Sequence, residues 1–340
     1  DRSFYDTVLD TSSEPLISWV AVAGQTANFN DAIMIGDRKG VVVGESGTIL
    51  TTDDGGYTFT EQTEAITQNI NAVAYNGTNL LYAVGAAGSI QHSADDGATW
   101  VSAAGVDSFS GILYGVAATA SYGIAVGAGG KVLISTNNGV IWSSTANAGS
   151  YSGIFQSVVL DSTGKAIAVG ENGEIQTSPD FGVTWVSRTP AGSYSNTFFD
   201  VAMNENGYAV VVGENGEIQT SSDFGATWTQ RTAADNYIGD FKRVAINGST
   251  IIAVGESGAI QTSYNSGQTW FSRPAAGAST ATMNGIALNY DNYAFIVGSS
   301  GTVQHTQILE GAVGNTYDVP EGLDLLNENR VYYWRGRYRD

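Results

Sequence analysis

The sequence predicts an all-β fold in which seven similar units close into a ring. Three observations lead to this prediction: a repeat of about 42 residues, four short strand-like stretches in each repeat, and a column of aromatic residues whose missing member stands at the other end of the chain. The composition agrees, because 43 glycines and only 5 prolines in 340 residues suit short strands joined by tight turns.

A Val-Gly pair marks the repeat. Nearly the same seventeen residues occur twice, as VGENGEIQTSPDFGVTW at 169–185 and VGENGEIQTSSDFGATW at 212–228. Successive glycines of this pair are 41 to 43 residues apart, and they are Gly44, Gly85, Gly127, Gly170, Gly213, Gly255 and Gly298. A period of this length is typical of propeller blades.

Each repeat contains four predicted strands. The first includes a short apolar pair, at 73–74, 116–117, 158–159, 201–202, 244–245 and 286–287, and more loosely at 33–34. The second runs into Val-Gly, the third follows the next glycine and alternates with period two, as in EIQTS, and the fourth begins at an aromatic residue. Four short strands joined by Gly, Asn and Asp turns predict a seven-bladed β-propeller.

The aromatic column indicates how the ring closes. Six repeats end on an aromatic residue, namely Phe59, Trp100, Trp142, Trp185, Trp228 and Trp270, whereas the seventh has none. Trp19 precedes Gly44 by 25 residues, and the other aromatics precede the next glycine by 26 to 28. We therefore expect the N-terminal strand to complete the last blade and protect its edge. The predicted divisions are an N-terminal extension (1–15), the propeller (16–306) and a C-terminal strand segment (307–340).

The charge and composition exclude several classes of partner. With 33 acidic and 14 basic residues the formal charge is −19, which repels nucleic acid and anionic membranes. The chain has no cysteine and no apolar run long enough for a membrane span, so we expect no disulfide, no thiolate metal site and no membrane insertion. Few lysines with much Ser, Thr, Asn and Gly favour an extracellular or virion protein.

The turn before each aromatic carries a motif of the form Ser/Thr-x-Asp-x-Gly-x-Thr-Trp. It appears as TDDGGYTF from Thr52, SADDGATW from Ser93, STNNGVIW from Ser135, SPDFGVTW from Ser178, SSDFGATW from Ser221 and SYNSGQTW from Ser263. It resembles the Asp-box, or bacterial neuraminidase repeat, of sialidases, sortilin-like propellers and seven-bladed photosystem II assembly factors of the Ycf48 type. This resemblance covers every blade and implies the fold rather than an activity.

We interpret the motif as a structural turn. A short carboxylate or amide accepts backbone N–H groups, the glycine takes a positive φ, and the aromatic is buried between blades. Asparagine replaces aspartate in two repeats, which keeps an acceptor but removes the charge that a general acid or a cation site needs. The predicted turn residues are Asp54, Asp95, Asn137, Asp180, Asp223 and Asn265.

A glycosidase is an alternative that the resemblance raises. Sialidases use an arginine cluster, a tyrosine-glutamate pair and an acidic proton donor, usually on six blades. Here Arg188, Arg231 and Arg273 each follow a blade tryptophan by three residues, which places them on outer strands where they cannot converge on the axis. We expect an arginine stripe with its stems packed on the sheet, or else an anion-binding strip.

No catalytic, cofactor or metal site is predicted. His92 and His305 both fall in the third strand, in the position that Thr177, Thr220 and Thr262 occupy elsewhere. STGKA at 162–166 lacks the upstream glycine of a phosphate-binding loop and lies in a predicted hairpin.

One face of the ring is the candidate binding surface. The turn after Val-Gly begins with Glu45, Glu171, Glu214 and Glu256, and in a propeller such turns share a face with the loops between blades. Those loops are rich in Ser, Tyr, Asn and Gly, as in SSTANAGSYSGIF and RTPAGSYSNTFF, a composition typical of recognition surfaces. The face is expected either to bind a glycan or a partner protein, or to be solvated scaffold.

The C-terminal segment departs from the repeat. NRVYYWRGRYRD at its end resembles late strands of a fibronectin type III-like sandwich, with too few strands to fold alone. We expect it to dock on a neighbouring domain or subunit through Arg330, Tyr333, Trp334, Arg335, Arg337 and Arg339.

The sequence thus predicts a non-enzymatic structural and recognition module of a larger extracellular or virion assembly, such as a phage tail, fibre or capsid-associated protein. Its expected partners are protein subunits or a cell-surface glycan. An assembly factor resembling Ycf48 and a divergent sialidase-like glycosidase are the alternatives.

Overall fold

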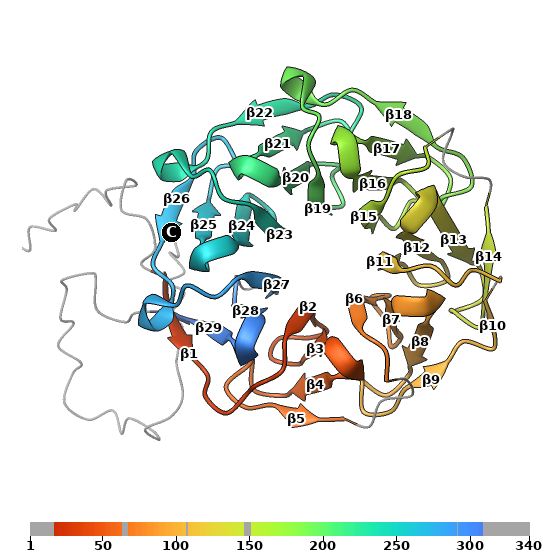
Figure 1. Cartoon of the computed structure of the whole chain (residues 1–340), viewed down its shortest axis with the longest axis horizontal. Helices are drawn as coiled ribbons and strands as arrows, with labels where there is room; N and C mark the ends of the chain where they lie inside the picture. The colour runs from red at the N-terminus through yellow and green to blue at the C-terminus, as the bar shows by residue number, and fades with distance from the viewer. Residues whose placement is uncertain (1–16, 63–66, 107, 146–150, 291, 309–340) are drawn as a thin grey trace, which may run out of the picture. The chain divides into compact units, whose positions relative to one another are not determined.

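In a computed structural model, the described residues (17–62, 67–106, 108–145, 151–290 and 292–308) form seven antiparallel blades arranged in a ring (Figure 1). This confirms the predicted all-β, seven-bladed propeller. The predicted extension (1–15) and the docking residues between Arg330 and Arg339 lie outside the described residues.

Each blade runs outward from the centre of the ring in chain order. Blade one is β2 (Phe29–Met34), β3 (Gly40–Gly44), β4 (Ile49–Thr52) and β5 (Thr60–Glu61), and blade two is β6 (Ile70–Tyr75), β7 (Leu81–Gly85), β8 (Ile90–Ser93) and β9 (Val101–Ser102). Blade three is β11 (Leu113–Ala118), β12 (Gly123–Gly127), β13 (Lys131–Ser135) and β14 (Ile141–Ser144). Blade four is β15 (Phe155–Leu160), β16 (Ala166–Gly170), β17 (Ile175–Ser178) and β18 (Val186–Arg188), and blade five is β19 (Phe198–Met203), β20 (Ala209–Gly213), β21 (Ile218–Ser221) and β22 (Thr229–Arg231). Blade six is β23 (Phe241–Asn247), β24 (Thr250–Gly255), β25 (Ile260–Ser263) and β26 (Phe271–Arg273).

Blade seven is completed by the start of the chain. Its first three strands are β27 (Met283–Leu288), β28 (Ala294–Gly298) and β29 (Val303–Ile308). Its fourth strand is β1 (Ile17–Ala21), which pairs antiparallel with β29 and sets Trp19 opposite Thr306. Trp19 is buried against a cluster that includes Ile260 and Ile286. The predicted closure by the N-terminal strand is therefore confirmed, and it leaves no blade a strand short.

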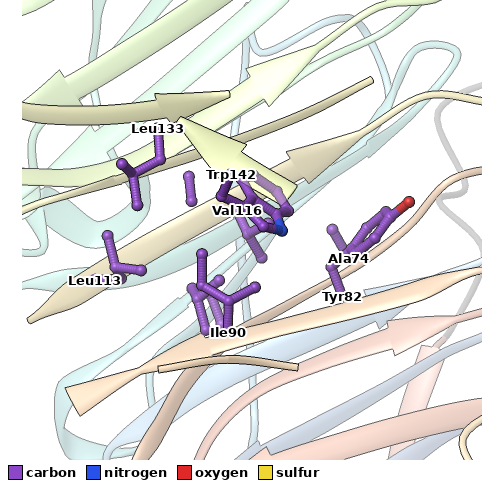
Figure 2. Close-up of a cluster of buried hydrophobic side chains, with 10 residues drawn as sticks. Ala74, Tyr82, Ile90, Leu113, Val116, Leu133 and Trp142 are labelled. Atoms are coloured by element: carbon purple, nitrogen blue, oxygen red, sulfur yellow. The ribbon is translucent and has the colours of Figure 1, made fainter. Parts of the chain in front are cut away.

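The core lies between blades rather than inside any one of them. Every residue of the second strand of each blade is buried, because both of its faces are covered by neighbouring blades. In the cluster of Figure 2, Trp142 of blade three meets Tyr82 of blade two edge to face, with ring centroids 5.8 Å apart. Each blade thus depends on its neighbour to bury its large side chains.

The glycine of the Val-Gly repeat has a steric cause. The backbone carbonyl that precedes the first strand of the same blade passes so close that a Cβ on Gly44 would lie 2.3 Å from the Asn28 oxygen, and one on Gly85 would lie 2.0 Å from the Asn69 oxygen. Only a residue without a side chain fits there, which explains why the pair recurs in all seven blades.

One strand was not expected. β10 (Gly105–Val106), in the linker between blades two and three, pairs in parallel with β14, and the Ala104 N–H donates to the Val140 carbonyl. This linker runs along the outer edge of blade three and satisfies backbone groups that an edge strand would otherwise leave to water.

A bulge recurs in the first strand of every blade. The pairing register shifts after the first residue, so that Phe29 lies opposite Gly44 but Asp31 lies opposite Val43, and all seven first strands behave alike. The second residue is the extra one, and the bulge redirects the side chains beside it. The consequence is that the second residues of all seven first strands, and the third residues of six of them, line the central channel.

Candidate binding face and axial channel

The two faces of the ring have different elements. We call the loop face the side that holds the linkers between blades and the 3-10 turns after each second strand, such as η1 (Glu45–Gly47), η4 (Glu171–Gly173), η6 (Glu214–Gly216) and η8 (Glu256–Gly258). We call the turn face the opposite side, which holds the Asp-box-like turns and the hairpins between first and second strands. The two elements of the turn face touch, since the Phe181 N–H donates to the Gly164 carbonyl over 2.7 Å.

The aspartates of the turn face hold the backbone of their own turns. Asp180 Oδ1 accepts the Thr184 N–H (2.8 Å) and the Ser178 hydroxyl (3.0 Å), while its Oδ2 accepts the Thr184 hydroxyl (2.8 Å). Burial raises the pKa of Asp180, but the hydrogen bonds from Thr184 outweigh it and hold the pKa below its usual value. The hydroxyl and N–H of Thr99 likewise lower the pKa of Asp95. The same bonds occur at Asp54 and Asp223.

The two asparagines make the equivalent bonds without charge. Asn137 Oδ1 accepts the Ile141 N–H at 3.0 Å, and Asn265 Oδ1 accepts the Thr269 N–H at 2.9 Å. Indole N–H groups add a further bond to the glycine carbonyl of the turn, as from Trp142 to Gly139 (3.0 Å). All of these contacts are internal to the turn, as the predicted structural role requires.

The blade aromatics differ in their polar contacts. Trp100, Trp142, Trp185 and Trp270 all donate their indole N–H to the turn glycine. Trp19 follows no such turn, and neither its buried Nε1 nor that of Trp228 has a hydrogen-bond partner among the described residues. Phe59 packs edge to face on Phe295, with ring centroids 5.9 Å apart.

The four glutamates of the loop face begin their 3-10 turns, and three of their carboxylates hold neighbouring groups. Glu45 accepts the Asn28 amide (2.9 Å), Glu171 accepts the Ile154 N–H (3.2 Å), and Glu256 lies 3.3 Å from the Lys242 ammonium. Glu214 stands at the same place in η6. These carboxylates hold the linkers and Lys242, which lies at the loop-face opening of the central channel.

The linker tyrosines are also committed to local structure. The hydroxyls of Tyr151, Tyr194 and Tyr237 donate to carbonyls at the start of the next blade or in its 3-10 turn, at 2.9 to 3.3 Å. Their rings pack on the first-strand phenylalanines. The composition of these loops suggested adaptable contacts, whereas the structure shows that these three rings brace the linker.

A glutamine in the third strand fixes the linker as well. Gln219 accepts the Ala191 N–H (2.8 Å) and donates to the Ala191 carbonyl (3.2 Å), which forms a two-bond clamp. Gln261 makes the same pair with Ala234, and Gln304 accepts the Ala276 N–H. The loop face is therefore built on a rigid support in blades five to seven.

The arginine stripe lies on outer strands, as predicted. Arg188, Arg231 and Arg273 donate from Nε to the hydroxyls of Thr177, Thr220 and Thr262 at 2.8 to 2.9 Å. His92 and His305 occupy the matching positions of blades two and seven. His305 is buried against Tyr57, and burial lowers its pKa. Within the part of the chain that the structure describes, no three His, Cys, Asp or Glu side chains gather in a way that could hold a metal ion.

The mouth of the channel on the loop face was not identified from the sequence. It is a cavity of about 190 Å³ whose lining includes the second residue of every first strand: Asn30, Asn71, Tyr114, Gln156, Phe199, Lys242 and Asn284. Three of these residues are asparagines on the consecutive blades seven, one and two, and each donates its amide to the first-strand carbonyl of the next blade at 2.8 to 3.0 Å. The mouth is thus amide-rich on one side and aromatic and cationic on the other.

A larger cavity of about 710 Å³ follows the axis towards the turn face, and its charged lining residues are the third residues of three first strands together with Asp37 near the turn face. Arg243 reaches from blade six to the Asn30 and Asn71 carbonyls, at 3.4 and 3.5 Å, and lines both cavities. Its Nε lies 3.6 Å from Asp31 Oδ1. Asp200 accepts the Ser157 hydroxyl (2.6 Å) and the Val244 N–H (2.9 Å). A charged residue in the third position of the first strand, where four other blades have a small residue, is the sequence signal that could have revealed this layer.

Comparison with known proteins supports the fold alone. No protein-family model matches the chain, and no curated protein is similar to it in sequence. The solved structure of Ycf48 bound to a D1 peptide is 20% identical, with a TM-score of 0.69 over 86% of this chain and 97% of that one. Ycf48 from Cyanidioschyzon merolae is 18% identical, with a TM-score of 0.68 over 84% and 98%. The WD40 propeller domain of Doa1 is 13% identical, with a TM-score of 0.68 over 86% and 96%.

No helix in the described ranges is both long and apolar enough to cross a membrane. At these identities the neighbours establish a seven-bladed propeller, and function has to be argued from the channel and its mouth.

Proposed function

We propose that this protein is a non-enzymatic recognition module whose loop face binds a partner protein at the channel mouth. The observation that carries the proposal is the asymmetry of this mouth, with amides on blades seven, one and two and with Tyr114, Phe199 and Lys242 on blades three, five and six. Amide oxygens can accept backbone N–H groups of an entering segment, while the aromatic rings provide apolar contact.

The support beneath the mouth favours binding with little rearrangement. Lys242 is held by Asp240 (2.8 Å) and Glu256 (3.3 Å) and lies 4.0 Å from the centre of the Phe199 ring. A preformed site loses little conformational entropy when a ligand binds. Ycf48, one of the structural neighbours, has been solved with a D1 peptide, so a propeller of similar fold can carry a peptide.

The setting that we propose is a larger extracellular or virion assembly, and its support is the strongly acidic composition with few lysines. The Ycf48-like alternative has the same kind of ligand, so it differs in setting rather than in chemistry. We do not propose a glycosidase, because the repeat-related arginines contact threonines on outer strands instead of grouping around the axis.

The test is selection of peptides from a random displayed library against the immobilised protein. We expect the selected peptides to lose about tenfold in affinity, or about 1.4 kcal/mol, when Phe199→Ala or Gln156→Ala alters the mouth. The matched control is Tyr290→Ala, which removes a 96% exposed aromatic ring from the turn face. Selected peptides that bind both mouth variants as tightly as the wild type would contradict the proposal.

A further inference from the structure

The larger axial cavity has charged side chains at its loop-face end, which we call the charged floor, and closure of the ring does not require them. Three charged side chains reach it from separate blades: Asp31 from β2, Asp200 from β19 and Arg243 from β23. The equivalent positions of the other blades hold small residues, namely Ala72, Gly115, Ser157 and Gly285. Four of the seven blades therefore take their place in the ring without a charged residue at the third position of the first strand.

The charges on this floor do not balance. Two carboxylates face one guanidinium, and the Nη groups of that guanidinium donate to the carbonyls of Lys242, Asn30 and Asn71. No bidentate pair forms with either aspartate. The contact of Arg243 with Asp31 is made by Nε, which lies 3.6 Å from Oδ1, while Oδ2 accepts the Val73 N–H over 3.0 Å.

The excess negative charge is largely shielded from water. Asp200 is 8% exposed, and the side chain of Asp31 is 16% exposed. Burial raises the pKa of Asp31 to about 6 and raises the pKa of Asp200 as well, in both cases in spite of Arg243, so a proton and a cation compete for these oxygens. A cation placed beside these oxygens would supply the missing charge.

The wall above the floor is aliphatic. Ile33, Val159, Ala202, Ala245 and Ala287 line it, and the cavity continues to the hairpins of the turn face at Asp37 and Tyr290. A volume of about 710 Å³ is within the usual range of small-molecule sites. The combination of an apolar wall and an anionic floor fits a ligand with an alkyl body and a cationic end.

We propose that the axial cavity binds an organic primary ammonium ion, with the ammonium group between Asp31 and Asp200 and its alkyl chain along the wall. A hard divalent cation fits less well, because the floor offers two carboxylates and a competing guanidinium. The ammonium can come from a free alkylamine or from a lysine side chain, and both share the same chemistry. The site does not rest on the proposed function, since it is reached from the opposite face.

The test is calorimetric titration of the full chain with hexylammonium, hexanoate and a glycine-flanked lysine peptide. We expect hexylammonium or the lysine peptide to bind and hexanoate not to bind, and the tighter of the two cations identifies the source. Asp31→Asn and Asp200→Asn should each weaken cation binding about tenfold. The matched control is Asp53→Asn, which removes an exposed carboxylate from the turn face.

A second variant keeps the test independent of the carboxylates. Ala202→Phe places a bulky ring in the path of the alkyl chain, leaves both aspartates in place and should weaken cation binding at least tenfold, whereas Ala226→Phe at an exposed turn position should leave it unchanged. The inference is overturned if neither cation binds the wild type, if hexanoate binds as tightly as the cations, or if Ala202→Phe retains wild-type affinity while melting cooperatively.

Discussion

At the residue scale, Asp180 shows what a turn aspartate contributes. It accepts three hydrogen bonds from Thr184 and Ser178, so Asp180→Ala should lower the free energy of unfolding by about 1 to 2 kcal/mol. Asp180→Asn should cost about 0.5 kcal/mol or less, because Asn137 makes the equivalent backbone bond in blade three. Urea unfolding of both variants checks this, and equal losses would contradict the structural role.

The buried Asp31 makes the opposite contribution to the pH dependence of stability. Its pKa of about 6 in the folded protein exceeds the ordinary value of 3.8, so the folded state binds a proton more readily than the unfolded state does. Stability from this group is therefore fully present below about pH 4 and is lost as the pH rises through about 6, by on the order of 3 kcal/mol. The lowered pKa values of Asp54, Asp95, Asp180 and Asp223 act in the other direction, since their stabilisation is lost as the pH falls through the folded-state pKa.

The variant Asp31→Asn separates the effect of Asp31 on the pH dependence of stability from the opposite effect of the turn aspartates. We expect the wild type to lose stability between about pH 4 and 6 relative to this variant, because the wild type has to ionise two buried carboxylates, Asp31 and Asp200, whereas the variant ionises Asp200 alone. Urea unfolding midpoints across this range provide the measurement. Parallel pH profiles for the two proteins would show that Asp31 is not the titrating group.

At the element scale, β1 is the latch of the ring. Trp19 is 6% exposed in the cluster between blades six and seven, so Trp19→Ala should cost about 3 to 5 kcal/mol. Val101→Ala is the control, since Val101 is 59% exposed on the outer strand β9 and should change little. If deletion of residues 1–24 left the melting temperature unchanged, the latch would carry no energetic weight.

The glutamine clamp is a second device at this scale. Gln219→Leu removes both bonds to Ala191, and we expect a loss of about 1 to 2 kcal/mol with faster hydrogen exchange at the Ala191 amide. Leucine fits sterically, because Leu50 and Leu133 occupy this position in blades one and three. Thr229→Val, on the exposed outer strand β22, is the control. Unchanged exchange at Ala191 would show that the linker is held by other contacts.

At the scale of the whole molecule, shared cores predict cooperative unfolding. Trp142 packs on Tyr82 of the neighbouring blade, and similar contacts run around the ring. An open repeat array loses cooperativity at its two ends, whereas a closed ring has no ends. We expect guanidinium transitions followed by tryptophan fluorescence and by far-ultraviolet circular dichroism to coincide. Two separated transitions would indicate that some blades unfold alone.

The two faces of the ring open into different cavities, the mouth on the loop face and the larger axial cavity on the turn face. Arg243, Tyr114 and Gln156 line both cavities and mark where the loop-face mouth meets the axial cavity. The proposed partner binding at the mouth and the proposed cation binding in the axial cavity are distinguished by variants that line one cavity each, such as Phe199→Ala and Ala202→Phe.

The sequence by itself determined the repeat, the position of most strands and the closure by Trp19. These features are local or periodic: a glycine is needed wherever a carbonyl passes within van der Waals distance, and an aromatic residue is needed wherever two blades meet. The same reasoning placed the arginine stripe on outer strands. It did not find β10, because two residues of a linker carry no strand period.

Only the tertiary structure decided the site. Asp31 is separated from Asp200 and Arg243 by about half of the chain or more, Asp200 and Arg243 stand on successive repeats, and each is a single charged residue in its own strand position. They converge because seven first strands line one axis and because a bulge in each redirects its second and third residues into the channel. The same is true of the mouth, whose amides and aromatic rings become neighbours only when the last blade is closed on the first. The physical reason is that a ring brings equivalent positions together whatever their separation along the sequence.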